Sequence, residues 1–405
     1  MKDLSIYIHI PFCVRKCLYC DFLSEKPSGN RMSEYAYALI NEIKQAGVYA
    51  ENYNVGTVFI GGGTPSMYGS DVMSDILNTL KETFESIRKG SFAPSEVTIE
   101  CNPGTVDMDK LESYKKCGVN RISFGLQSAN YEELKMLGRI HTYEDWVNSV
   151  ATARKAGFSN INVDLISGLP RQSRESFSNT LRKVLDYETE HISVYSLIVE
   201  ENTPFYDMYH PDNMTDEQYD KWEREDRAIY DMTYDMLLSR GYTQYEISNY
   251  AKPGFACKHN LVYWNRGNYL GLGLGSSSMI DDIRFKNCSG LKKYIDYYTQ
   301  PDADTGISFA ASPLSDKFYT NAMHEDVQKL TREEQMSEHI MLGLRKAAGI
   351  DISEFNERYK TDFLKKYDWQ VKKWTDAGML ELKRGRVCCT HRGLSVSNRI
   401  IVDFM

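Results

Sequence analysis

Residues 4 to about 198 alternate short runs rich in β-branched residues with longer amphipathic stretches. This alternation is typical of successive βα units, and six of them predict a parallel sheet with covering helices. The predicted strands are 4–10, 57–60, 96–100, 121–125, 160–166 and 191–197, and the helices between them are 33–46, 71–87, 107–116, 142–156 and 173–186.

The rhythm changes after residue 198, so closure into an eight-stranded barrel is not expected. A highly charged helix is predicted at 215–240 and a strand at 245–248, and a glycine-rich run follows at 271–278. Between 300 and 328 the composition turns loop-like, which predicts a boundary. We therefore expect a core of residues 1–300, in which about 200–300 form an extension, a linker at 301–328 and a C-terminal domain at 329–405.

The C-terminal part has helical patterns followed by a hairpin pattern. Thr331 and Glu334 match the capping box that begins a helix. The expected elements are helices at 331–347, 352–359 and 367–377 and a hairpin at 378–389. This order predicts a small winged-helix-like α+β module, which in an acidic chain we expect to pack against the core or cover a substrate.

The charge balance limits the classes of partner. Among 405 residues there are 48 Lys and Arg against 56 Asp and Glu, a net charge of −8. An acidic chain disfavours broad electrostatic binding to nucleic acid or to an anionic membrane. No apolar run approaches the roughly 20 residues that span a bilayer, and no signal-peptide pattern is present. We therefore expect a cytoplasmic protein.

Three of the nine cysteines, Cys13, Cys17 and Cys20, lie within eight residues directly after the first predicted strand. Clustered thiols in a reducing compartment are more often metal ligands than disulfides. Zinc would require a fourth ligand, for which His9 is the nearest candidate. An iron–sulfur cube held by three thiolates would leave one iron free for a small ligand, and the spacing differs from that of ferredoxins. The other six cysteines are scattered and are interpreted as buried small hydrophobic residues.

Polar and glycine residues gather at the ends of the next predicted strands. The run 61–65, Gly-Gly-Gly-Thr-Pro, permits close backbone approach to a small polar ligand. Glu100, Gln127 and Asp164 lie near the carboxyl ends of three successive strands, where a parallel barrel assembles its site. Arg139 is either a clamp for a carboxylate or a solvated surface residue.

The three cysteines and the glycine run together resemble the radical S-adenosylmethionine (SAM) superfamily, in which such a cluster reduces the sulfonium of the cofactor. The segments 7–13, 61–65, 124–127 and 164–170 are similar to the oxygen-independent coproporphyrinogen III oxidase group. The resemblance implies an open (β/α)6 partial barrel of the radical SAM type and a [4Fe–4S] cluster on the three cysteines. It also implies SAM on Tyr7, Gly62, Gly63, Thr64, Glu100, Gln127, Arg139 and Asp164, with Tyr19 bordering the adenine.

Two departures distinguish the chain from the oxidases of this group. Phe22 stands where the oxidases carry a further cysteine, and the chain begins at the first strand, where they carry an N-terminal extension. The sequence around Cys20, together with the run 259–264, His-Asn-Leu-Val-Tyr-Trp, is instead similar to the HemW branch, regarded as heme chaperones. The resemblance implies heme and heme-accepting proteins as partners. It leaves open whether those acceptors lie at the membrane surface and whether the chain forms a homodimer.

His259 is a candidate axial ligand of heme, because it is followed by Tyr263 and Trp264, whose rings could cover a macrocycle. The alternative is a histidine packed with two aromatic residues under the glycine-rich run. Cys257 is a second candidate ligand. Two functions remain open: a heme chaperone that retains the cluster and SAM site, and a radical enzyme that decarboxylates coproporphyrinogen III or opens the heme ring.

Overall fold

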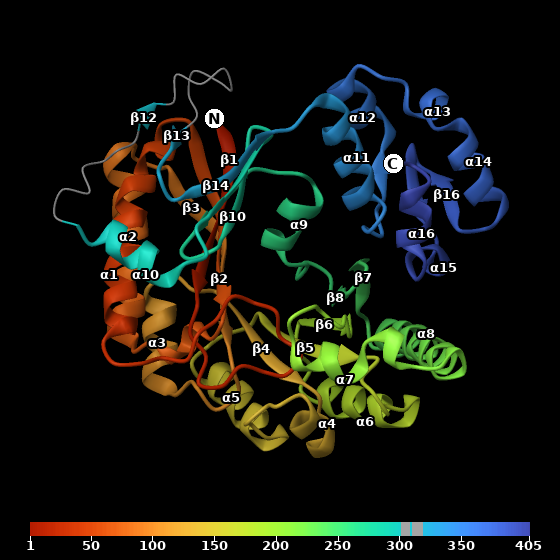
Figure 1. Ribbon diagram of the computed structural model, residues 1–405, viewed down its shortest axis with the longest axis horizontal. Coiled ribbons are helices and arrows are strands. Elements are labelled where there is room, and N and C mark those ends of the chain that lie inside the picture. The colour runs from red at the N-terminus through yellow and green to blue at the C-terminus, as the bar shows by residue number, and fades with distance from the viewer. Residues whose placement is uncertain (301–307, 310–318) are drawn as a thin grey trace.

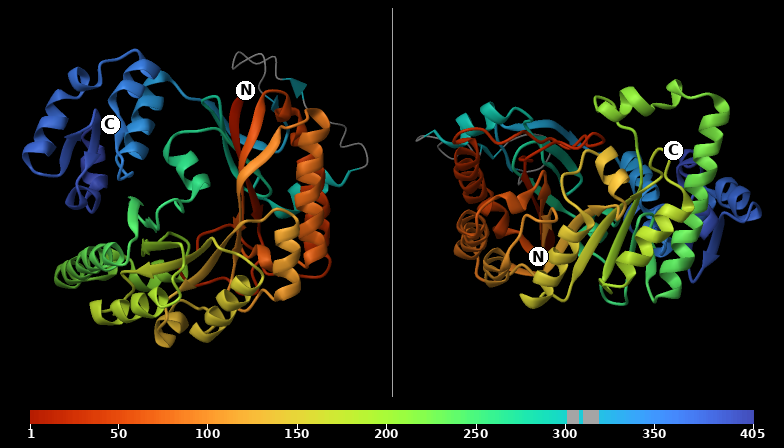
Figure 2. Two further views of the ribbon diagram at one scale, coloured as in Figure 1. Left: turned by 180° about the vertical axis from the view of Figure 1, so that it is seen from behind. Right: turned by 90° about the horizontal axis from the view of Figure 1, so that it is seen from below.

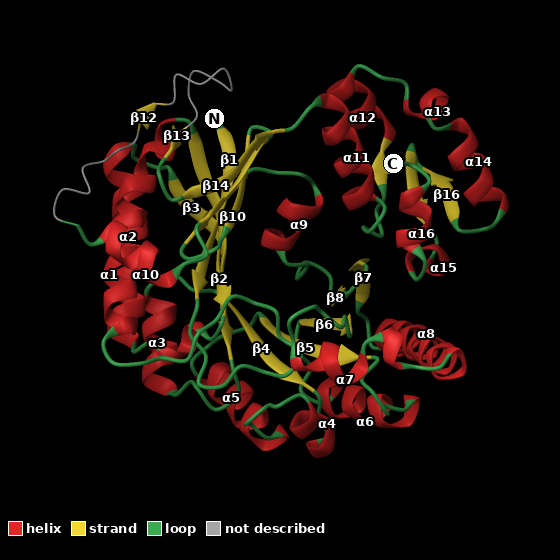
Figure 3. Cartoon of the chain, in the orientation of Figure 1, coloured by secondary structure: helices red, strands yellow, loops and turns green. Residues whose placement is uncertain are grey.

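The computed structural model describes residues 1–300, 308–309 and 319–405 of the chain (Figure 1). Its largest element is a curved sheet whose outer face is covered by helices, with a smaller helical unit at its side (Figure 3). No helix in the described residues is long and apolar enough to cross a membrane.

Six parallel strands form the centre of the sheet and lie side by side in chain order. Each leads into one or more helices of the outer layer, which confirms the predicted α/β partial barrel. The strands are β1 (Lys2–Ile10), β2 (Tyr53–Gly62), β3 (Phe92–Cys101), β4 (Arg121–Gln127), β5 (Ile161–Ser167) and β6 (His191–Ser196). The helices that follow them are α1 (Arg31–Ala46), α2 (Ser70–Ile87), α3 (Met108–Lys116), α4 (Tyr131–Met136), α5 (Tyr143–Lys155) and α6 (Arg174–Leu185).

The outer helices pack through one apolar face. In α2 the buried residues Met73, Ile76, Leu77, Leu80 and Phe84 recur every three or four positions and face the sheet. Along the inner strands, by contrast, every second side chain points into the barrel. That alternation places polar residues of β1 to β6 on one concave surface.

The sheet is wider than the six strands predicted from the pattern. Strand β9 pairs with β1 in parallel, and β10, β11 and β14 continue that edge, while β8 and β7 extend the other edge beyond β6. The predicted strand 245–248 covers the end of β7 and the turn that leads to β8, and the glycine-rich run contains the end of one strand and the start of another. The bounds are β7 (Thr243–Glu246), β8 (Asn249–Ala251), β9 (Tyr269–Leu272), β10 (Ser277–Ile280), β11 (Ile283–Asn287) and β14 (His324–Lys329).

The range expected to be a linker contributes to the main sheet. Residues 301–307 and 310–318 lie outside the described residues, but β14, at the end of that range, pairs with β11. Two short strands, β12 (Ser308–Phe309) and β13 (Tyr319–Thr320), pair with each other. The remaining helices up to this point are α7 (Pro204–Tyr209), α8 (Asp216–Ser239), α9 (Lys258–Trp264) and α10 (Leu291–Tyr298), with 3-10 turns at Gly47–Glu51, Pro65–Met67 and Pro211–Asn213.

The C-terminal residues form a three-stranded antiparallel sheet with helices around a hydrophobic core of their own. Thr331 and Glu334 make the predicted capping box at the start of α11. The elements are α11 (Arg332–Gly343), β15 (Ile350–Asp351), α12 (Ile352–Tyr359), α13 (Phe363–Lys366), α14 (Asp368–Asp376), β16 (Leu380–Lys383), β17 (Arg386–Cys389), α15 (His391–Leu394) and α16 (Ser397–Val402).

Figure 2 shows the C-terminal unit at the side of the barrel. This unit contacts the edge strand β7 and the helix α8. The backbone N–H of Ala347 donates to the carbonyl of Tyr245 at 3.0 Å. The ring of His391 lies 2.9 Å from Asp231 of α8 and packs beside Tyr234. The small unit is therefore fixed to the barrel by backbone pairing and by side-chain contacts.

Candidate functional site

The three clustered cysteines lie on the loop between β1 and α1, which backbone hydrogen bonds hold at the carboxyl edge of the barrel. The N–H of Cys13 donates to the carbonyl of Glu25 at 3.1 Å, and that of Leu18 donates to the carbonyl of Leu137 at 3.0 Å. The three thiols are free and half-buried. Burial, chiefly, and then the neighbouring Cys17 and Cys13 thiols raise the pKa of Cys20 to about 11.

Within the residues described, no group of three or more His, Cys, Asp or Glu side chains is arranged to hold a metal ion. The loop thus gathers the three thiols at one edge of the barrel, with their sulfurs not converged on a single point. His9, the candidate fourth ligand for zinc, uses both ring nitrogens in contacts with Tyr7 (3.0 Å) and the carbonyl of Leu23 (2.8 Å). This arrangement disfavours a zinc site completed by His9.

The glycine run begins in the last two residues of β2 and packs directly against the cysteine loop. A Cβ on Gly63 would lie 2.6 Å from the carbonyl oxygen of Phe12 and 2.8 Å from that of Ile10, so only glycine fits without a shift of the backbone. Gly62 has a φ of +107°, which a side chain rarely adopts. The close approach of these two backbones explains the glycines, and it leaves Thr64 beside Cys13, with 3.5 Å between Oγ1 and Sγ.

Two carboxyl groups, of Glu100 and Asp164, project from β3 and β5 into the barrel. Glu100 accepts a hydrogen bond from the N–H of Gly62 at 3.1 Å. Withdrawal from water, and secondly the charge of Asp164, raise the pKa of Glu100 to about 8. Asp164 accepts from Ser123 at 2.8 Å and from Asn162 at 2.9 Å. Glu100 can therefore hold a proton at neutral pH, and two donors hold the side chain of Asp164 in place.

Arg139 lies at the cysteine loop and not on the open surface. Its guanidinium donates to the carbonyl of Gly125 at 2.7 Å, to Asn102 at 2.8 Å and to the sulfur of Cys17 at 3.4 Å. Asn102 in turn donates to Thr64 at 2.8 Å. The sequence did not single out Asn102. Its position two residues beyond Glu100, at the end of β3, is the sequence feature that could have indicated a site residue.

The remaining residues expected to bind SAM also lie at this edge. Gln127 ends β4 with a φ of +69°. Tyr7 lies in the barrel on β1, where burial, chiefly, and the charge of Glu100 raise its pKa well above the usual value. Tyr19 packs edge-on against Phe205 of α7, with 6.3 Å between ring centroids. The structure thus brings the predicted set to one end of the barrel.

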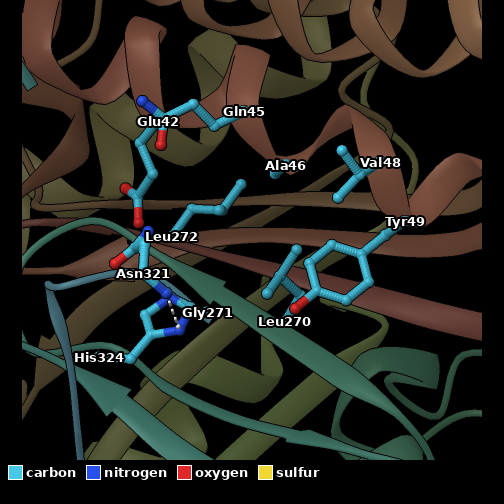
Figure 4. Close-up of a pocket in the computed structure, with 10 residues that line it drawn as sticks. All are labelled: Glu42, Gln45, Ala46, Val48, Tyr49, Leu270, Gly271, Leu272, Asn321 and His324. Carbon is cyan, nitrogen blue, oxygen red and sulfur yellow. Dashed lines mark hydrogen bonds between the residues drawn. The ribbon is translucent and has the colours of Figure 1, made fainter. Parts of the chain in front are cut away.

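A small pocket between α1 and β9 is separate from this set (Figure 4). Its lining includes Glu42, Tyr49, Leu270 and His324, and its volume of about 40 Å³ suits water better than heme. Glu42 accepts from the N–H of Gly273 at 2.6 Å, and burial raises its pKa to about 7. This carboxyl ties α1 to the turn between β9 and β10.

Residues 258–264 form α9, directly after Cys257. The helix lies against the inner face of the barrel, and Glu96 of β3 holds its first turn. Glu96 accepts hydrogen bonds from the N–H groups of Lys258 and His259, each at 3.0 Å, and from the thiol of Cys257 at 3.3 Å. Burial, chiefly, raises the pKa of Cys257 to about 12. The thiol is fully buried and donates to Glu96, so it presents no atom to a heme iron in this arrangement.

His259 is 1% exposed, and both of its ring nitrogens contact protein side chains. Nδ1 lies 2.8 Å from Oγ1 of Thr57, and Nε2 lies 2.9 Å from the hydroxyl of Tyr263. Because Thr57 donates its own proton to Ser5, the imidazole donates from Nδ1 and accepts at Nε2. His259 is thus packed against Tyr263 and Phe59, and an iron ligand at His259 would require one of these bonds to break.

Comparisons with known proteins give the family. The radical SAM superfamily matches residues 7–184, and the HemN C-terminal domain matches residues 330–396. The protein of Bacillus subtilis named heme chaperone HemW is 32% identical over 401 residues, which are 99% of each chain. The Escherichia coli protein of that name is 40% identical over 281 residues, covering 69% of this chain and 71% of its own. The chain belongs to the HemW family.

The likeness extends to a solved structure, coproporphyrinogen III oxidase (HemN) from Escherichia coli. That structure covers the whole of this chain and 90% of its own, with a TM-score of 0.78 and 23% identity, which confirms the shared fold. Membership of the HemW family within the radical SAM superfamily implies a [4Fe–4S] cluster and SAM. Phe22, which separates this chain from the oxidases in sequence, is 66% exposed beside the cysteine loop.

The residues present fit these two groups. Three half-buried thiols supply the soft ligands that iron–sulfur clusters take. Arg139 keeps an Nε group that is buried and has no hydrogen-bond partner among the described residues, which leaves a donor for a further acceptor. Glu100 and Asp164 offer carboxyl oxygens, and the glycine run exposes backbone groups. This donor set suits a zwitterionic ligand that carries hydroxyl groups.

Proposed function

We propose that this chain is a heme chaperone, which binds heme and delivers it to heme-accepting proteins. The observation that carries this proposal is the likeness over nearly the whole chain to the relatives named heme chaperone HemW, which includes the C-terminal region as well as the barrel. The exposed Phe22, in place of the further cysteine of the oxidases, agrees with it.

The proposed cofactors are a [4Fe–4S] cluster on Cys13, Cys17 and Cys20 and SAM beside it. The guanidinium of Arg139 would take the carboxylate of SAM, because its planar fork matches a carboxylate. When bound, the reduced cluster supplies an electron to the sulfonium of the cofactor. The other proposed contacts are Tyr7, Tyr19, Gly62, Gly63, Thr64, Glu100, Gln127 and Asp164.

Heme is the proposed cargo, and its ligand is a separate question. His259 stays a hypothesis that requires α9 to release one ring nitrogen, since Thr57 and Tyr263 hold both. The Soret band of heme tests it directly. A band unchanged in His259→Ala excludes His259 as the ligand, whereas a shifted or lost band, with the fold intact by circular dichroism, supports it.

A second function is a radical enzyme that decarboxylates coproporphyrinogen III or opens the heme ring. The observation that favours it is the complete set of polar strand-end residues, from Glu100 to Asp164, around the cysteine loop. Such chemistry requires a substrate carbon held close to the cofactor, since a misplacement of about 1 Å can cost on the order of 100-fold in rate.

The experiment that separates the two functions is anaerobic incubation of the reconstituted protein with SAM, a reductant and each tetrapyrrole in turn. The chaperone proposal predicts tight heme binding and no altered tetrapyrrole. Stoichiometric conversion of either tetrapyrrole supports the radical enzyme. It excludes a chaperone that binds the cofactors but does not alter the tetrapyrrole.

A further inference from the structure

A continuous chain of hydrogen bonds joins two of the three cysteines. It runs from the sulfur of Cys13 to Oγ1 of Thr64 (3.5 Å), from there to the amide of Asn102 (2.8 Å), on to the guanidinium of Arg139 (2.8 Å) and finally to the sulfur of Cys17 (3.4 Å). These residues come from the cysteine loop, from the ends of β2 and β3 and from the segment after α4. The chain therefore depends on the tertiary fold.

Asn102 is the middle of this chain, and its side chain suits both neighbours. Its Nδ2 group donates to Thr64, while its Oδ1 atom accepts from Arg139. A side-chain amide offers both a donor and an acceptor, whereas an ionised aspartate only accepts and an aliphatic residue does neither. An asparagine is thus suited to link Thr64 on one side to Arg139 on the other.

The backbone of β4 closes the chain from the other side. The carbonyl of Gly125 accepts from the same Nη2 atom of Arg139 that contacts Asn102, at 2.7 Å. A Cβ at residue 125 would lie 3.4 Å from Nη2 of Arg139, 3.5 Å from Oδ1 of Asn102 and 2.9 Å from Nε2 of Gln127. Glycine lets the strand approach closely enough to hold the guanidinium in one orientation.

The position of this guanidinium has a consequence for redox chemistry. Hydrogen bonds to the sulfurs of an iron–sulfur cluster, and positive charge close to it, stabilise the more negative reduced state and raise the reduction potential. Arg139 provides a hydrogen bond and a positive charge at Cys17, and the hydroxyl of Thr64 provides a hydrogen-bond donor at Cys13. Asn102 contacts neither sulfur and acts through these two residues.

We propose that Asn102 is a positioning residue that holds Arg139 and Thr64 against the sulfurs of Cys17 and Cys13, and thereby raises the reduction potential of the cluster on those thiols. The proposal rests on the proposed cluster ligands and is independent of heme delivery. The step concerned is the uptake of one electron, from dithionite in the experiment, which converts [4Fe–4S]²⁺ to [4Fe–4S]⁺ without making or breaking a bond.

The test is a redox titration of the anaerobically reconstituted full chain without SAM, followed by electron paramagnetic resonance of the reduced cluster. Loss of one charge-assisted hydrogen bond predicts about a tenfold weaker stabilisation of the reduced state in Asn102→Ala. For a one-electron couple this corresponds to a potential about 59 mV lower. The matched control is Asn179→Ala, an exposed asparagine on α6 that contacts Arg182 and should keep the wild-type potential.

A second pair of variants covers the case in which Asn102→Ala binds no cluster. Thr64→Val removes the hydroxyl and should lower the potential, whereas Thr64→Ser keeps it and should restore the wild-type value. Potentials of Asn102→Ala or Thr64→Val equal to wild type, at equal iron and sulfide content, overturn the proposal. A wild-type protein that takes up no iron contradicts the cluster ligands themselves, which distinguishes that failure from the failure of the positioning role.

Discussion

Glu96 of β3 and His259 of α9 are joined across the inside of the barrel, where the carboxylate accepts the backbone N–H of the histidine at 3.0 Å. The same carboxylate accepts the N–H of Lys258, so it satisfies two of the free donors at the start of α9. A short helix of seven residues has little stability of its own. The position of α9 therefore depends on Glu96.

We expect Glu96→Ala to loosen α9 without unfolding the barrel. The substitution removes the acceptor of the buried N–H of His259 and of the part-buried N–H of Lys258, at a cost of about 1–3 kcal/mol, which corresponds to roughly 10- to 100-fold faster local opening. Hydrogen–deuterium exchange of residues 258–264, compared with that of β4 as an internal reference, measures this. Unchanged exchange in α9 would show that Glu96 does not hold it.

The acid dependence of stability should reflect the buried imidazole of His259. Burial, chiefly, and the charge of Arg121 lower its pKa from about 6.5 to about 3. The folded state stays neutral at this position while the unfolded chain takes up a proton, so stability is complete above about pH 6.5 and is lost as the pH falls toward 3. Between pH 6.5 and pH 5 this amounts to about 2 kcal/mol.

His259→Asn removes this titration, so the midpoint of urea unfolding should fall less between pH 7 and pH 5 than in wild type. The comparison uses the slope against pH, since the variant changes the midpoint at every pH by its lost contacts. Parallel slopes would mean that His259 is protonated in the folded protein.

Glu100 should have the opposite pH dependence. Its pKa is raised to about 8 in the folded protein, so the folded state keeps a proton that the unfolded chain loses near its usual value of about 4.5. The stability associated with this proton is complete below about pH 4.5 and is lost as the pH rises through 8. In the iron-free protein, Glu100→Gln should melt at a higher temperature than wild type at pH 8 and at a similar temperature at pH 4.5. A difference that does not change with pH contradicts this assignment.

Close backbone packing at Gly63 makes a fourth substitution informative. Gly63→Ala places a Cβ against the backbone of Phe12 and Ile10, so the cysteine loop must move, and we expect the iron content after reconstitution to fall at least several-fold. Gly290→Ala is the control, because that exposed glycine has only the Cβ of Lys293 within 4 Å, at 3.6 Å. Equal iron content in both variants would show that the loop tolerates displacement.

The six central strands could be predicted because each is a short β-branched run. The position of Glu100 and Asp164 at one end of the barrel could be predicted because the carboxyl ends of parallel strands lie at the same edge. The edge strands β9, β10 and β14 could not, since a glycine-rich or loop-like sequence becomes a strand only when a neighbour supplies the hydrogen bonds. The roles of two further residues also depend on tertiary contacts and could not be predicted from the sequence. Glu96 and Asn102 owe their roles to partners 163 and 37 residues away.

Heme transfer from the anaerobically reconstituted protein to an apo heme protein tests the central claim most directly. The chaperone proposal predicts that the loaded chain binds heme stoichiometrically and passes it intact to the acceptor, so that the acceptor's absorption spectrum replaces that of the donor and extraction recovers unaltered heme. Failure to bind heme, or recovery of a decarboxylated or ring-opened tetrapyrrole in stoichiometric amount, would contradict it.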